Sequence, residues 1–296
     1  MTAADRQGDG KFGSEVACIT VSYYSAADIV ELVGSLRESS VALGSIIVVN
    51  NAVDDRLDEV RELDGVSIVE AGRNAGYGAA VNIGAASLPP SIEWILVANP
   101  DVKVEPTTLS TLLAAAEAAP AAGALGPTLT DEDGAIYPSA RELPSLRTGI
   151  GHALFANPFP GNRWTRRYRG EDRPATATTR ESGWLSGAFL LIRRQAFEQI
   201  GGFDPSYFMY FEDVDLGRRL GEAGWVSLYV KDAVVVHHGA SSTQRVAAAM
   251  NRAHHQSAYQ YLARRYSATW LWPLRATLRI ALAARERFTR HRNRTG

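Results

Sequence analysis

The sequence has one cysteine, Cys18, among its 296 residues. A single cysteine cannot build an internal disulfide framework, so we expect an intracellular, reducing compartment and exclude a disulfide-stapled secreted scaffold. No apolar run reaches the length of a membrane-spanning helix. No secretory leader is evident in residues 1–15, which are polar and which we expect to be disordered.

Two glycine-rich phosphate-binding loops are also missing. The sequence contains no G-x-x-x-x-G-K-[ST] motif, and no G-x-G-x-x-G follows the first expected strand. If this chain binds a nucleotide, we therefore expect a metal ion, rather than a nest of glycine amides, to handle the phosphates.

Lysine is scarce, and the charge is unevenly distributed along a chain of net charge −1. The residues before Tyr261 include 22 basic and 31 acidic side chains, whereas the tail from Tyr261 to Gly296 contains nine arginines and one acid. An asymmetry of this size indicates a partner for the tail. The acidic body argues against nucleic acid as that partner.

The tail combines tryptophan with arginine. A helix is expected over residues 250–266, and Trp270 and Trp272 lie beyond it among leucines and arginines. Amphipathic segments of this kind bind the membrane interface without crossing it, and anionic lipid attracts their arginines. We therefore expect residues 246–296 to associate with an anionic membrane surface. The alternative is a helix that packs on the acidic body.

Short apolar runs alternate with helical patterns in the first half of the chain. Strands are expected at residues 16–21, 45–49, 66–69 and 94–98, and further strands at 189–192 and within 225–236. The runs are continuous and 46% of all residues are hydrophobic, as expected for strands that are covered on both faces. This alternation predicts an α/β fold with a mostly parallel, doubly wound sheet.

Polar residues follow four of these strands in succession: Tyr23, Asn50, Asn51, Asp55, Asn74 and Asp101. The carboxyl ends of parallel strands meet at one sheet edge, so these residues predict a shared ligand crevice. Asp101 follows a strand that stops at Asn99-Pro100, and a carboxylate there suits a divalent metal beside phosphate oxygens. Asn and Asp are also common turn residues, and Asp101 alternatively caps the helix that Pro106 opens.

The aromatic stretch 203–211 leads directly into Glu212, Asp213 and Asp215. Acids in a first helical turn are favoured by the helix dipole, so capping is one interpretation. Three acids behind an aromatic wall indicate more, namely one carboxylate that accepts a proton and others that orient groups. His237 follows the last expected strand region, where it is either a metal ligand that complements Asp101 or a structural histidine.

Residues 131–180 lack periodicity and are rich in proline, glycine and arginine. A loop of this length inside a compact domain is usually functional, so we expect it near an acceptor or a membrane. The alternative is a variable excursion on the surface.

These residues together resemble the family-two glycosyltransferases of the GT-A fold, the inverting type that uses nucleotide-sugars. The resemblance covers residues 16–266, and the order and spacing of the motifs make it specific although each motif alone is weak. Within the family the chain is most similar to actinobacterial rhamnosyltransferases of cell-wall linker assembly, in the stretches Val97-Ala-Asn-Pro-Asp-Val102, Gly123-Ala-Leu-Gly-Pro127, Tyr137-Pro-Ser-Ala-Arg141 and Tyr207-Phe-Met-Tyr210. The motifs of the family as a whole are Val21-Ser-Tyr23, Asn50-Asn51 with Asp55, Asn74-Ala-Gly-Tyr77 with Asn82, Asn99-Pro-Asp101, Trp184-Leu-Ser-Gly-Ala188, Phe208-Met-Tyr-Phe-Glu-Asp-Val-Asp-Leu216 and His237.

The resemblance implies a role for each matched residue. Asp213 would be the catalytic base, and Glu212 beside it would contact the acceptor. Asp101, assisted by His237, would hold Mg²⁺ or Mn²⁺, weakly because Asn99 stands where a second aspartate is usual. The nucleotide-sugar would be held by Ser22, Tyr23, Asn50 and Asp55 around the base and ribose, by Asn74, Gly76 and Asn82 on the diphosphate side, and by Asn51 and Asn99.

The resemblance also implies a reaction and a location. A dTDP-L-rhamnose donor would deliver its sugar to N-acetylglucosamine on a polyprenyl diphosphate, at the cytoplasmic face of the membrane, in arabinogalactan linker assembly. The catalytic domain would span residues 16–245, with a nucleotide-sugar-binding half at 16–127 and an acceptor half at 128–245. The same fold with another sugar or acceptor, and a non-catalytic nucleotide-sugar-binding scaffold, are the alternatives, and an oligomer is compatible with each.

Overall fold

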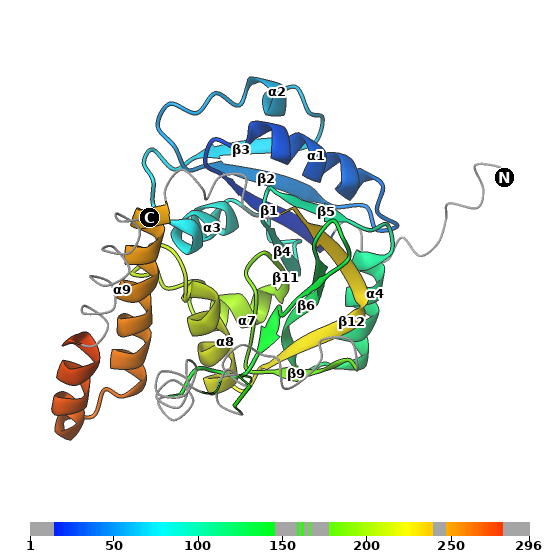
Figure 1. The fold of residues 1–296 in the computed structure, drawn as a ribbon. Helices are drawn as coiled ribbons and strands as arrows, with labels where there is room; N and C mark the ends of the chain where they lie inside the picture. Colours follow the sequence, from blue (N-terminus) through cyan, green and yellow to red (C-terminus); the bar gives the residue numbers. More distant parts are fainter. Residues whose placement is uncertain are drawn as a thin grey trace.

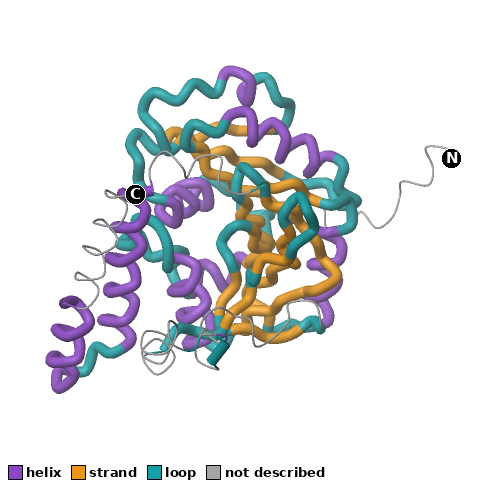
Figure 2. Tube along the Cα trace, in the orientation of Figure 1, coloured by secondary structure: helices purple, strands orange, loops and turns teal. Residues whose placement is uncertain are grey.

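The structure is a computed structural model that describes residues 15–145, 159, 161–162, 166, 178–238 and 247–280, without the side chains of 247–252 (Figure 1). Within these residues the strands run through the centre, and helices lie on both sides of them (Figure 2). The polar start of the chain and the last part of the basic tail, residues 1–14 and 281–296, lie outside the described residues.

Four parallel strands form the first half of the sheet, in the order β3-β2-β1-β4. They are β1 (Val16–Ser22), β2 (Ser45–Asn50), β3 (Val66–Glu70) and β4 (Trp94–Ala98). They are connected by the helices α1 (Ala26–Arg37), α2 (Asp58–Arg61) and α3 (Tyr77–Ala86). The mostly parallel α/β sheet that the sequence predicts is thus confirmed, and its continuous apolar runs form strands with helices on both faces.

The second half of the sheet mixes strand directions. β11 (Phe189–Arg193) lies antiparallel between β4 and β6 (Ala122–Thr130), and β12 (Val226–His237) runs parallel to β6. β5 (Val102–Val104) runs antiparallel to the end of β12. Residues 225–236 therefore contribute one long strand, irregular between Val230 and Val234.

Helices cover both faces of the sheet (Figure 1). Apolar residues of α1 and α4 (Thr108–Ala118) are buried in one core cluster, with Ile29, Leu32, Leu109 and Leu112 among them. α3, α7 (Arg194–Gln199) and α8 (Glu212–Glu222) contribute to a second core cluster. α9 (Ala247–Arg265) packs at the edge of the molecule, where its Tyr261 contacts the aromatic stretch and α8.

The region predicted as a long irregular loop is not wholly irregular. It begins with the short strands β7 (Ile136–Tyr137) and β8 (Ala140–Arg141) and ends at β9 (Arg180–Ser182), while β10 (Trp184–Leu185) pairs with β8. Most of residues 146–177 lie outside the described residues. Beyond α9, a 3-10 turn (Thr269–Leu271) precedes helical residues 272–280. None of the helices described here has the length and apolar character needed to cross a membrane.

Candidate active site

Asp101 and His237 come together because the chain turns sharply after β4. After Asn99-Pro100-Asp101 the chain enters β5, whose Val102 lies opposite His237 in the β5–β12 pairing. Asp101 Oδ1 consequently lies 3.2 Å from His237 Nε2. The structure therefore brings together the two residues, 136 positions apart, that the sequence predicts as metal ligands.

The pair fits a divalent cation. Burial raises the pKa of Asp101, but the hydrogen bond and charge of His237 outweigh burial and hold that pKa below its usual value, which keeps the carboxylate ionised. Ligands about 2.1 Å from an ion in adjacent octahedral positions lie about 3 Å apart, close to the spacing of this pair. The described residues contain no group of three acidic, histidine or cysteine side chains that could hold a metal. The remaining coordination positions would thus fall to phosphate oxygens or water.

The loop after β2 folds back on the end of β1. Asp55 Oδ2 accepts hydrogen bonds from the Ser22 hydroxyl and from the Tyr24 amide, both at 2.9 Å. Buried Asn50 supports the loop from inside, where its Nδ2 donates to the Asp55 carbonyl at 3.3 Å. Tyr23 and Tyr24 are both exposed, with ring centres 4.9 Å apart. Exposed aromatic rings beside a fixed carboxylate suit a base and a ribose.

Asn51 and Asn74 shape the loop before α3. Asn51 is buried, its Nδ2 donates to Asn74 Oδ1 at 3.2 Å, and its Oδ1 accepts the Ala75 amide at 2.8 Å. Gly76 has a φ of +85°, and a Cβ there would lie 2.3 Å from the carbonyl oxygen of Phe208, so the position requires glycine. These contacts make Asn51 a positioning residue and leave Asn74 at the surface, where a ligand can reach it.

The hydrogen bonds of Asn82 do not fit the role on the diphosphate side that the resemblance implies for it. Its Nδ2 donates to the Phe203 carbonyl at 2.7 Å, and its Oδ1 accepts the Phe203 amide at 2.9 Å. Both ends of the amide are therefore engaged in tying α3 to the aromatic stretch. Asn82 is better explained as a positioning residue than as a diphosphate ligand.

Tyr77 stands in one of the sequence motifs, but the sequence alone assigns it no role in the site. Its hydroxyl donates to the Gly187 carbonyl at 2.8 Å. Burial raises the pKa of Tyr77 well above its usual value, and the charges of Glu212, Asp213 and Asp101 add to the rise. The acids from two distant parts of the sequence thus lie near one hydroxyl. Only the fold reveals this, because Tyr77 otherwise fits an ordinary first helical turn.

Asp213 is held at the same sheet edge as Asp101. Its Oδ2 accepts the Gly187 amide at 3.1 Å, and its Oδ1 accepts the Val214 amide at 2.8 Å. The carbonyl of Ala188 accepts a hydrogen bond from the Asn99 amide at 2.8 Å, which joins this segment to the end of β4. The predicted base and the segment that precedes Asp101 are therefore joined through Gly187 and Ala188.

Burial raises the pKa of both neighbouring carboxyl groups. For Glu212, burial is the largest cause and the charge of Asp213 the second, and Glu212 Oε2 has no hydrogen-bond partner among the described residues. For Asp213, burial is opposed by the amides of Gly187 and Val214 and by the charge of Arg141. Since those amides stabilise the ionised form of Asp213 and Glu212 Oε2 lacks such a donor within the described ranges, Glu212 is the more readily protonated of the two. The pair thus offers a carboxylate base beside a carboxylic acid.

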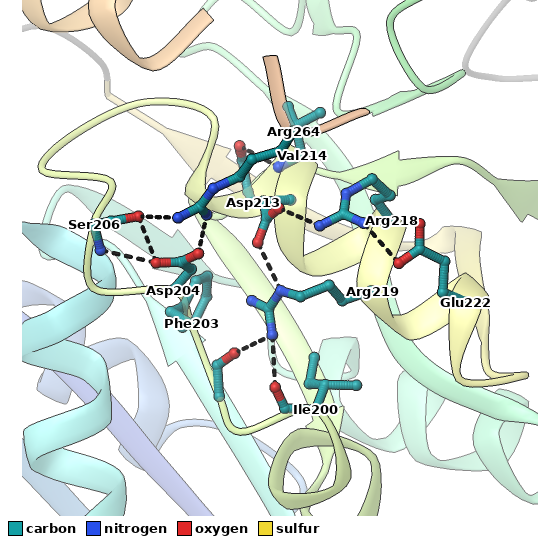
Figure 3. A network of polar contacts seen from close by, with 12 residues as sticks. Ile200, Phe203, Asp204, Ser206, Asp213, Val214, Arg218, Arg219, Glu222 and Arg264 are labelled. Carbon is teal, nitrogen blue, oxygen red and sulfur yellow. Dashed lines mark hydrogen bonds and ion pairs between the residues drawn. The ribbon is translucent and has the colours of Figure 1, made fainter. Parts of the chain in front are cut away.

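Asp215, the third acid, has a structural role. It is fully buried, its Oδ1 lies 2.8 Å from Arg218 and its Oδ2 lies 2.6 Å from Arg219. Arg219 also donates to the carbonyls of Ile200 and Gly202, at 2.8 and 2.7 Å (Figure 3). This network fixes the turn after α7 against α8.

A pocket of about 320 Å³ lies beside Asp213. Aromatic side chains form much of its wall, and its charged and polar residues are Arg141, Glu142, Ser186, Glu212, Asp213 and His254. The aromatic residues are Tyr137, Trp184, Tyr210 and Phe211.

The sequence analysis assigned no site role to Arg141, Trp184, Tyr210 or His254. The Arg141 guanidinium lies 5.6 Å from the ring centres of both Tyr137 and Trp184. In the part of the chain that the structure describes, Arg141 makes no ion pair with an acid. Arg141, Trp184 and Tyr210 stand within stretches that carry the family resemblance, and this is the signal that the sequence offers for them. Because His254 belongs to α9, no local pattern could have placed it here.

The chain is similar to known glycosyltransferases in sequence and in fold. A family model described as glycosyltransferase like family 2 matches residues 36–255. Over 278 residues the chain is 45% identical to the N-acetylglucosaminyl-diphospho-decaprenol L-rhamnosyltransferase of Mycobacterium tuberculosis, and the match covers 90% of each chain.

Solved structures of other glycosyltransferases share the fold. The mannosyltransferase PcManGT of Pyrobaculum calidifontis, in complex with GDP-Man and Mn²⁺, has a TM-score of 0.56 at 18% identity over 91% of this chain and 75% of that one. GalNAc-T7, with UDP, GalNAc and Mn²⁺, has a TM-score of 0.53 at 16% identity over 75% of this chain and 43% of that one. This chain therefore belongs to glycosyltransferase family 2 and has the GT-A fold.

Proposed function

We propose that this protein transfers L-rhamnose from dTDP-L-rhamnose to N-acetylglucosamine on a polyprenyl diphosphate, with inversion at the anomeric carbon. The observation that carries the proposal is the 45% identity, over 90% of each chain, to a rhamnosyltransferase named for an acceptor of this kind. A match of that extent includes both the nucleotide-binding half and the acceptor half of the catalytic domain.

The donor would lie along the ends of β1, β2 and β4. Ser22, Tyr23, Asn50 and Asp55 would form the pocket for base and ribose, where Asp55 is already fixed by two hydrogen bonds. Asn74, Gly76 and Asn99 would line the path of the diphosphate, and Asn51 and Asn82 would support it. Asp101 and His237 would hold Mg²⁺ or Mn²⁺, which when bound offsets the negative charge of the leaving diphosphate.

Asp213 would act as the base. It takes the proton of the acceptor hydroxyl while that oxygen forms a bond to the anomeric carbon, and dTDP leaves from the opposite face with the electrons of the broken bond. Glu212, which holds a proton, can donate a hydrogen bond to an oxygen of the acceptor sugar. The aromatic walls of the pocket suit a sugar ring, and the Arg141 guanidinium suits the diphosphate of the acceptor.

Calorimetric titration of dTDP, UDP and GDP, with and without Mg²⁺ or Mn²⁺, tests the donor. We expect metal-dependent binding that is selective for dTDP, followed by transfer from dTDP-L-rhamnose to a lipid-linked N-acetylglucosamine. Selective binding of UDP or GDP would refute the proposed donor while keeping the family.

The segment after α9 would bind the membrane in which such an acceptor resides. Trp270 and Trp272 are 76% and 66% exposed, and Ile280 is 70% exposed. Exposed tryptophans beside arginines suit the interface of an anionic bilayer. We expect the variant with both Trp270→Ser and Trp272→Ser to float less with phosphatidylglycerol vesicles than the unaltered chain. Val53→Ser, which removes an equally exposed apolar side chain elsewhere, is the control, and equal flotation of all three proteins would contradict the proposal.

A further inference from the structure

The residues before the proposed base adopt an unfavourable backbone conformation. Tyr210 and Phe211 have φ values of +66° and +67° in succession. Side chains with a Cβ rarely occupy this left-handed region, and such strain persists only where the surroundings hold it in place. Because Glu212 and Asp213 follow at once, whatever holds this turn also sets where the two carboxyl groups point.

One side of the turn is held by α3. The Phe208 carbonyl accepts the Tyr77 amide at 3.1 Å, and Gly76 leaves just enough room for that carbonyl. This hydrogen bond holds the turn against the expected donor site, but only through Phe208, the residue at the beginning of the turn.

The other side of the turn is held by α9. Ser257, which is buried, donates its hydroxyl to the Met209 carbonyl at 2.9 Å. The His254 ring centre lies 5.5 Å from the centres of both Tyr210 and Phe211. The fully buried Tyr261 ring lies 5.6 Å from the Phe211 ring. Three successive residues of the turn therefore contact the same helix.

The same helix also fixes the beginning of the aromatic stretch. Arg264 forms an ion pair with Asp204, and its second amino group donates to the Ser206 hydroxyl at 3.0 Å. Gln260 donates to the same hydroxyl. Figure 3 shows Arg264 reaching across to Asp204 and Ser206, beside the start of α8.

We propose that α9 is a positioning element of the active site, with Ser257 and Tyr261 holding the left-handed turn in the conformation that presents Asp213 to the acceptor. α9 contacts residues of the aromatic stretch from Asp204 to Phe211, and it contributes His254 to the pocket beside the base. The segment proposed to bind the membrane follows α9 after the short connection 266–268, so α9 lies between the proposed membrane contact and the base. The inference rests on the proposed role of Asp213.

Exchange of Ser257 for alanine in the full chain tests the inference. The variant loses the hydroxyl that bonds the Met209 carbonyl but creates no large cavity. We expect kcat to fall about fivefold, the factor that corresponds to one net hydrogen bond of about 1 kcal/mol. The donor KM and the Kd of dTDP should stay within twofold, because the donor site lies on the α3 side of the turn. Ser257→Thr keeps the hydroxyl and should retain more turnover than Ser257→Ala.

The matched control is Gln256→Ala, at the neighbouring exposed position of α9, which should match the unaltered chain in kcat. Equal kcat values for Ser257→Ala and Gln256→Ala would overturn the inference. So would a parallel loss of kcat, dTDP affinity and melting temperature in Ser257→Ala, since that indicates general support of the fold. Failure of the proposed function is recognised separately, because then the unaltered chain gives no transfer from dTDP-L-rhamnose, or Asp213→Asn keeps its activity.

Discussion

Replacing Asp213 by asparagine should remove turnover and leave the fold and the donor site intact. Asparagine keeps the size of the side chain, but its one oxygen can accept only one of the two amides that now donate to Asp213. The loss of one hydrogen bond costs about 1 kcal/mol, which is small beside a typical domain stability of about 5–15 kcal/mol. Loss of a general base lowers kcat by about 10²- to 10⁴-fold.

The matched exchange is Glu212→Gln. Since burial and the charge of Asp213 raise the pKa of Glu212, this residue holds a proton near neutral pH, and glutamine resembles that protonated form. We therefore expect the kcat of Glu212→Gln to fall about tenfold at most, because only the hydrogen bond to the acceptor changes. The kcat of Asp213→Asn should be at least about tenfold lower than that of Glu212→Gln.

The assay follows release of dTDP and formation of the lipid-linked product, with dTDP affinity and melting temperature measured on the same preparations. Both variants should bind dTDP with the affinity of the unaltered chain. If Glu212→Gln lost more turnover than Asp213→Asn, Glu212 would be the base. If both kept near-full activity, neither acid would take the proton and the proposed chemistry would be wrong.

Three further predictions address the charged groups of the site. Folding raises the pKa of Glu212, so the free energy of unfolding falls as pH rises from the ordinary carboxyl pKa toward the raised one. The fall is about 1.4 kcal/mol for each pH unit in that range. Glu212→Gln should therefore raise the melting temperature more at pH 9 than at pH 5, and an equal change at both pH values would contradict this. Asp101→Asn and His237→Ala should each abolish the strengthening of dTDP binding by Mg²⁺ or Mn²⁺ in calorimetry and leave metal-free binding unchanged, whereas retained metal dependence would place the metal elsewhere. Arg141→Ala should raise the acceptor KM about tenfold with the donor KM unchanged, and Arg141→Lys should do so less, since a charge-assisted hydrogen bond contributes about 1.5–3 kcal/mol. A rise in the donor KM alone would show that Arg141 serves the nucleotide instead.

The elements that were predicted best are those with strong local patterns. The continuous apolar runs of β1, β2, β3 and β4 predicted a mostly parallel sheet, and the structure confirms it. In α1 the apolar residues Ile29, Leu32, Val33 and Leu36 recur at i, i+3, i+4, i+7 spacing, and all four are buried. Proline after Asn99 identified where β4 ends and hence where Asp101 lies. Each of these follows from chemistry within a few residues of the chain.

The antiparallel strands and the pocket could not be predicted in this way. β11 reads as the same kind of apolar run as β4, and only its neighbours in the sheet decide its direction. Asn82 carries the same amide as Asn51 and Asn74, but the approach of the Phe203 backbone commits both of its ends. Arg141 and His254 reach one pocket from distant parts of the chain, β8 and α9.

The sequence by itself determined the α/β class, the strand ends at which polar side chains gather, and the acidic pair at the start of α8, because apolar periodicity and motif spacing are local properties. Only the tertiary structure decided that Asp101 meets His237, that two backbone amides favour the ionised form of Asp213 over that of Glu212, and that α9 holds the left-handed turn before them. These are contacts between residues far apart in the chain, and their energies depend on burial and direction. Such burial and hydrogen bonding arise only when folding brings these distant residues next to one another.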